Sequence, residues 1–252
     1  MNESKYYNDI LNKYGDFIYE AVDFKTIFNF DTSNIELIKK YEIDKLVASE
    51  HFIQCLMNVC QYVYRIVPHN KPILSNPYAY SGFDILQKHL KNNSLNCAGY
   101  SILYNDIMLT LGYTSKCIFC RPYDLYDDDS HVLCQVYNHE ENKWIVVDPA
   151  QGCIPCDENE TCFDIIELRN AIKSNKPLKL MRSKNSYHQI TKTLDYVKYL
   201  NKYLFMFLVI DEYGLKYDMS TQKLIIPQHF VCSDFDVPFK CQITYNKYYL
   251  LN

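Results

Sequence analysis

A helix-patterned segment followed by three strand-like segments constrains the fold of this chain most strongly. Apolar residues recur at helical spacing over 102–111, and Gly112 follows where a left-handed C-terminal cap belongs. Segments 114–121, 132–137 and 143–147 then read as strands, the last ended by Asp-Pro. A helix followed by antiparallel strands predicts an α+β fold.

Cys97 stands at the start of that helix. A polar stretch precedes it, and Asn96 is a suitable N-cap, so Cys97 is expected in the first turn. Unsatisfied N–H groups and the helix dipole favour a thiolate at this position. Ala98 and Gly99 leave room beside the sulfur for a carbonyl substrate, and the backbone N–H of Cys97 is suited to donate to an oxyanion. Cys97 is therefore the candidate nucleophile.

His131 and Asp148 can be related to each other through the intervening hairpin. Residues 138–141 read as a four-residue loop, which would pair Tyr137 with Asn142. In that register His131 and Asp148 lie directly opposite each other on one face, with Cβ atoms about 5 Å apart. Asp148 would then orient the imidazole, giving a Cys97, His131 and Asp148 arrangement of nucleophile, base and orienter.

The remaining segments extend this prediction over the chain. Residues 1 to about 67 have helical spacing, 84–89 and 193–203 read as helices, and 204–210, 223–226 and 240–250 read as strands. We expect a single domain over 1–252, comprising an N-terminal helical segment (1–75), a catalytic core (82–180) and a C-terminal α/β extension with a helix and strands (185–252).

Composition excludes several classes of function. Of 252 residues, 48% are apolar and the net charge is −4, with no basic stripe, so we expect no nucleic-acid partner. The longest apolar run, 204–210, is too short to span a bilayer, and the first residues lack the apolar stretch of a secretory signal. Eleven cysteines at irregular spacing suggest reduced thiols, and we expect a cytoplasmic protein.

Two C-x-x-C pairs offer a rival interpretation, a zinc-stabilised interaction domain. Cys117 and Cys120 form the first pair, and Cys153 and Cys156 form the second. The first pair lies in a predicted strand, where residues three apart face opposite ways and cannot chelate together without a bulge. Cys153 and Cys156 flank a proline in a predicted turn, where ligation is feasible. Buried, unreactive cysteines are the ordinary alternative.

A run of three aspartates, 127–129, precedes His131. A solvated loop is the simpler interpretation of this run. The functional alternative is that the three carboxylates raise the pKa of the histidine and attract cationic groups toward the site.

The segment from Asn96 to Gly152 resembles the transglutaminase-like superfamily, a papain-related fold that includes transglutaminases, peptide N-glycanases and bacterial cysteine peptidases. CAGYS at 97–101 resembles the nucleophile motif, and LGY at 111–113 resembles the turn that ends its helix. His131 with the following valine resembles the second motif, and 144–149 the third. The chain departs from the usual pattern at Leu95, Leu133 and Ala150, positions that bear on substrate specificity.

This resemblance implies a nucleophile helix packed on an antiparallel sheet, with Cys97 as nucleophile, His131 as base and acid, and Asp148 as orienter. It implies a thiol enzyme that transfers acyl groups from a protein or peptide without a cofactor. No calcium-loop pattern is visible, which favours a cysteine peptidase or amidase; the alternatives are a protein-glutamine transglutaminase and a non-catalytic binding module. Tyr62, Tyr64 and Tyr80 remain open as oxyanion-hole donors.

Overall fold

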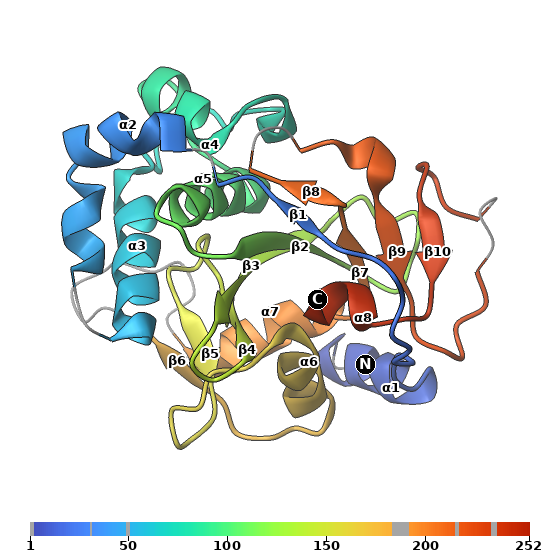
Figure 1. Cartoon of the computed structure of the whole chain (residues 1–252). Helices are drawn as coiled ribbons and strands as arrows, with labels where there is room; N and C mark the ends of the chain where they lie inside the picture. Colours follow the sequence, from blue (N-terminus) through green and yellow to red (C-terminus); the bar gives the residue numbers. More distant parts are fainter. Residues whose placement is uncertain (1–2, 31, 49–50, 183–191, 215–216, 233–235) are drawn as a thin grey trace.

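The computed structural model describes residues 3–30, 32–48, 51–182, 192–214, 217–232 and 236–252, and its fold is α+β (Figure 1). The helices are α1 (Glu3–Lys13), α2 (Ile35–Lys40), α3 (Phe52–Ile66), α4 (Gly82–Asp84), α5 (Cys97–Thr110), α6 (Ile165–Lys173), α7 (Thr193–Tyr203) and α8 (Tyr248–Leu251). Short 3-10 turns lie at Thr32–Asn34, Ile43–Val47, Pro77–Ala79 and Met219–Thr221, and a π-helical turn follows α4 at Ile85–His89. The strands are β1 (Ile27–Phe28), β2 (Ser115–Arg121), β3 (His131–Asn138), β4 (Lys143–Val147), β5 (Ile154–Cys156), β6 (Lys179–Met181), β7 (Met206–Val209), β8 (Glu212–Tyr213), β9 (Lys223–Ile225) and β10 (Gln242–Thr244).

A six-stranded sheet, ordered β10-β9-β7-β2-β3-β4, forms the centre of the molecule. Its neighbours are antiparallel except for β9 and β10, which run parallel. Strand β2 pairs with β3 along one edge and with β7 along the other, so strands from the last third of the chain complete the same sheet as the predicted core. The expected C-terminal extension is thus built into the central sheet, and its first residues, 185–191, lie outside the described residues.

Helices cover both faces of this sheet, and the alternation of side chains along β2 produces two separate cores. Cys117 and Phe119 pack toward α3 and α5, whereas Ile118 and Cys120 pack toward α6 and α7. Figure 1 shows α5 and α3 on one side of the sheet and α6 and α7 on the other. A sheet buried on both faces explains why residues 115–120 are all buried.

Most predicted elements are present. The helix at 193–203 and the strands β2, β3, β4, β7 and β9 lie where the pattern placed them, within one or two residues at their ends. The segment 240–250 was predicted as a strand, but only Gln242–Thr244 pairs, and the chain then turns into α8. Helix α6 was missed although it carries a capping box, in which Asp164 and Glu167 each accept a backbone N–H of the other.

Among the described residues, none of the helices is long and apolar enough to cross a bilayer. The apolar run 204–210 instead contains β7, and every one of its side chains is buried in the protein core.

Candidate active site

Helix α5 begins at Cys97, as the sequence predicts. The Asn96 side chain caps it by accepting the Gly99 N–H at 3.0 Å, and Gly112 closes the other end with a φ of +89°. The Cys97 side chain is partly exposed, and its thiol donates to the Ser130 carbonyl at 3.6 Å. The start of α5 therefore meets the residue directly before β3.

The hairpin between β3 and β4 has a different register from the one predicted. Asn138 pairs with Lys143, so the loop is 139–142 and continuation of this register puts Asp148 opposite Leu133 rather than His131. The Asn138 side chain accepts the Glu140 N–H at 3.0 Å while its own backbone stays in the ladder, which starts the turn one residue later. The predicted direct opposition was wrong.

His131 and Asp148 nevertheless meet as diagonal neighbours. The register differs from the prediction by two, and a shift of two keeps both side chains on one face of the sheet. His131 Nε2 lies 2.8 Å from Asp148 Oδ2, and both side chains are fully buried. The second oxygen, Oδ1, accepts the Gln151 N–H at 3.0 Å, which holds the carboxylate in the turn after β4.

The imidazole of His131 holds its proton more firmly than an ordinary histidine. Burial alone lowers its pKa, but the charge of Asp148, its hydrogen bond and the neighbouring Cys97 thiol together raise the pKa to about 10. Since Nε2 faces Asp148, Nδ1 is the ring nitrogen left for the thiol side of the site. The geometry therefore suits an imidazolium paired with a carboxylate beside a cysteine.

Three tyrosines of α7 cover this pair, and the sequence analysis missed their role. Tyr196 donates to Asp148 Oδ2 at 3.2 Å, and the Tyr199 hydroxyl lies 3.0 Å from His131 Nδ1. Tyr203 packs its ring against the imidazole with centroids 6.2 Å apart. Their spacing of three and four residues places them on one helix face, and the sequence is sufficient to predict this. The sequence does not show that this face covers His131 and Asp148.

A cavity of about 450 Å³ opens beside Cys97 and His131. Tyr64, Gln151 and Tyr199 also line it. Of the other two tyrosines considered as oxyanion donors, Tyr62 lines a different pocket, and Tyr80 packs on the His89 ring.

The aspartates ahead of His131 are not simply solvated. Asp127 and Asp129 each contact Lys202 of α7, at 3.0 and 2.9 Å, and Asp129 also accepts the Tyr203 hydroxyl. These contacts hold the loop before β3 against α7. The pKa of His131 is raised by Asp148 and Cys97, so the aspartate run is not the main cause of that shift.

The rival cysteine pairs point into different cores. Cys117 and Cys120 lie on opposite faces of β2, as the strand argument predicts, and Cys153 and Cys156 likewise belong to different apolar clusters. Over the described ranges, no three His, Cys, Asp or Glu side chains gather so as to hold a metal ion.

No protein-family model matches the chain, and no curated protein matches it. Among solved structures, one from Cytophaga hutchinsonii, provisionally described as a cysteine protease, is similar to it at 13% identity and a TM-score of 0.36. The similarity covers 63% of this chain and 55% of that one, so the chain spans little more than half the length of that protein. So distant a likeness carries no weight for function, which depends on the geometry of the site itself.

Proposed function

We propose that this protein is a thiol-dependent acyl-transfer enzyme, a cysteine peptidase or amidase of papain-related, transglutaminase-like fold. Cys97 is the nucleophile, His131 the base and acid, and Asp148 the orienter. The observation that carries the proposal is the buried His131–Asp148 hydrogen bond of 2.8 Å beside a cysteine in the first turn of α5. Nucleophile, base and orienter are the three parts that such chemistry requires.

The reaction follows from this arrangement. Asp148 accepts Nε2–H, and in the resting site the proton of the Cys97 thiol has passed to Nδ1, which gives a thiolate paired with the imidazolium; this thiolate attacks the substrate carbonyl. The backbone N–H of Cys97 lies in the first helical turn, where N–H groups lack intrahelical acceptors, and it donates to the developing oxyanion. His131 then protonates the departing amine, which leaves an acyl-enzyme that water hydrolyses, and the thiol is regenerated.

The acceptor decides between two activities on the same triad. Water gives a hydrolase, and a lysine amine gives a protein-glutamine transglutaminase. We favour hydrolysis because the chain has no calcium-loop pattern. Incorporation of a labelled amine into a glutamine-rich protein, compared with release of ammonia or a peptide, separates the two.

Alkylation by iodoacetamide as a function of pH tests the proposal. Cys97, Cys232 and Cys241 are partly exposed and the other eight thiols are buried, so few can react in the folded protein. We expect one fast thiol at mildly acidic pH, lost in Cys97→Ala and slowed in His131→Ala. The matched control Cys241→Ala should retain it. Uniformly slow labelling of all thiols in the parent would contradict the proposed enzymatic function.

A further inference from the structure

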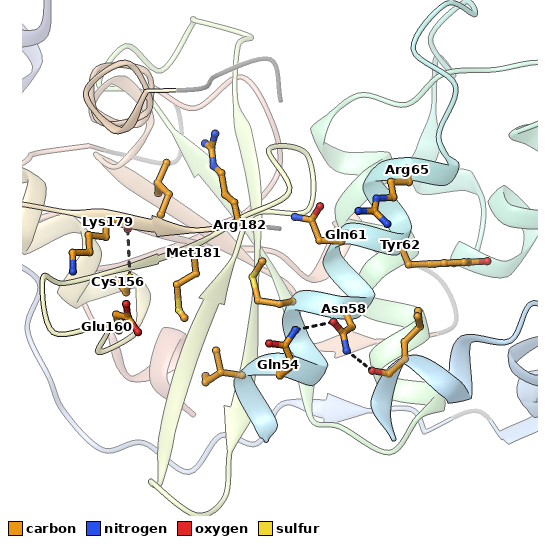
Figure 2. A pocket seen from close by; sticks show the side chains of 14 residues that line it. Gln54, Asn58, Gln61, Tyr62, Arg65, Cys156, Glu160, Lys179, Met181 and Arg182 are labelled. Atoms are coloured by element: carbon orange, nitrogen blue, oxygen red, sulfur yellow. Dashed lines mark hydrogen bonds between the residues drawn. The ribbon is translucent and has the colours of Figure 1, made fainter. Parts of the chain in front are cut away.

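A second pocket, of about 590 Å³, lies between α3 and the antiparallel pair of strands β5 and β6 (Figure 2). We call it the α3–β6 pocket. The charged side chains of Arg65, Glu160, Lys179 and Arg182 and the apolar ones of Met57 and Met181 line it. Its volume lies within the range of sites that hold small ligands or short peptide segments.

The charge of this pocket is opposite to that of the chain. Among the described residues that line it, Arg65, Lys179 and Arg182 are cationic and Glu160 alone is anionic, whereas the whole chain has a net charge of −4. Guanidinium groups form strong hydrogen bonds to carboxylates, and the exposed Arg65 is accessible for a bidentate pair, whereas Nε and Nη2 of Arg182 are buried. The charges of the lining therefore favour a negatively charged ligand.

The rest of the lining suits a polypeptide better than a bare anion. Met57 and Met181 supply adaptable apolar surface, which an inorganic anion would not use. Gln54 and Asn58 form a row of amides on α3, joined by a hydrogen bond of 2.8 Å. Side-chain amides both donate and accept, as an extended peptide backbone requires.

The cationic end of this pocket adjoins the candidate active site. Gln61 donates to the Gly152 carbonyl at 2.5 Å, and Arg182 contacts the neighbouring Cys153 thiol. Gly152 and Cys153 belong to the turn after β4, which Asp148 closes by pairing with Cys153. On the same turn Gln151 lines the cavity beside Cys97. One short turn thus separates the two sites.

We propose that the α3–β6 pocket binds an acidic segment of a polypeptide, with carboxylates on Arg65 and Arg182 and an apolar side chain on the two methionines. Resting on the proposed function, this identifies the substrate class as acidic polypeptides that carry the reacting carbonyl to Cys97.

The test is binding of the fluorescein-labelled peptide Gly-Glu-Leu-Glu-Gln-Gly to the full chain carrying Cys97→Ala, followed by fluorescence anisotropy. We expect Arg65→Gln and Arg182→Gln each to raise Kd about tenfold, as loss of a hydrogen bond to a charged group implies. Arg65 is exposed, so its replacement leaves the core intact. The matched control Lys240→Gln removes an exposed charge beside β10, across the molecule in Figure 1, and should leave Kd unchanged.

Three outcomes overturn the pocket's role: equal affinity for the peptide with Gln in place of Glu, equal loss in the Lys240→Gln control, or displacement by inorganic phosphate at constant ionic strength. Because binding is measured without turnover, it is independent of the triad. If the peptide does not bind but Cys97 of the parent is alkylated fast, the proposal for the pocket is overturned and the proposed triad stands. If the peptide binds in an arginine-dependent way but Cys97 of the parent is alkylated slowly, the proposed enzymatic function is overturned and the pocket proposal stands.

Discussion

The buried His131–Asp148 pair predicts how stability depends on pH. The pKa of His131 is about 10 in the folded protein, against about 6.5 in an unfolded chain. Below pH 6.5 both states hold the proton and the stabilisation is present in full. From pH 6.5 to about 10 only the folded state holds it, so the free energy of unfolding falls as the pH rises. The expected slope is about 1.4 kcal/mol per pH unit, with a total of at most about 5 kcal/mol.

A second buried group opposes this trend. Burial lowers the pKa of Lys116 to about 7, so between pH 7 and about 10 the unfolded state holds more protons at this position. That contribution makes stability rise with pH by a similar amount. Between pH 7 and about 8.5 the two contributions oppose each other and the parent alone can show a nearly flat profile. Above about pH 8.5 the buried cysteines, whose pKa values burial raises, add a further loss of stability. The His131 contribution must therefore be isolated by comparison.

The isolating change is Asp148→Asn, which removes the charge that raises the pKa of His131. Urea unfolding at pH 6.5 to 9.5, followed by the fluorescence of the single tryptophan, Trp144, gives both free energies. We expect the destabilisation caused by Asp148→Asn to shrink by about 1.4 kcal/mol per pH unit. In the control Lys116→Met, stability should fall more steeply with pH than in the parent. A destabilisation independent of pH would show that Asp148 does not hold a proton on His131.

Two further changes test the surroundings of the site, and a third tests a close backbone approach elsewhere in the fold. Tyr199→Phe removes the hydroxyl 3.0 Å from His131 Nδ1. Since this hydroxyl competes with the Cys97 thiol for that nitrogen, the rate of Cys97 alkylation at pH 6 should rise about fivefold in the variant. An unchanged rate contradicts this. Tyr196→Phe removes a buried donor to Asp148 and should cost about 1–3 kcal/mol in urea unfolding; a neutral effect would mean the carboxylate does not need it. Gly214 has a φ of +111°, and in Gly214→Ala the new Cβ would lie 2.6 Å from a backbone carbonyl oxygen. The free energy of unfolding should therefore fall by about 2 kcal/mol or more. A thermal melt with an unchanged Tm would contradict this.

Local features of the sequence determined the elements that carry the proposed triad. The Asn96 cap and the Gly112 terminator define α5 through contacts within a few residues, so the position of Cys97 could be predicted. The alternation of strand residues placed His131 and Asp148 on one face even though the hairpin register was wrong by two. Short-range rules tolerate such an error because a shift of two preserves the face.

Only the tertiary structure decided what surrounds these residues. Strand β7 pairs with β2 across more than eighty residues, and this non-local pairing makes the C-terminal part complete the sheet. It also brings α7 over the imidazole, so that Tyr196 and Tyr199 contact Asp148 and His131. Helical periodicity shows which residues share a face, but not what that face packs against, because packing depends on burial summed over the whole chain. The same holds for the α3–β6 pocket, whose two walls are far apart in sequence.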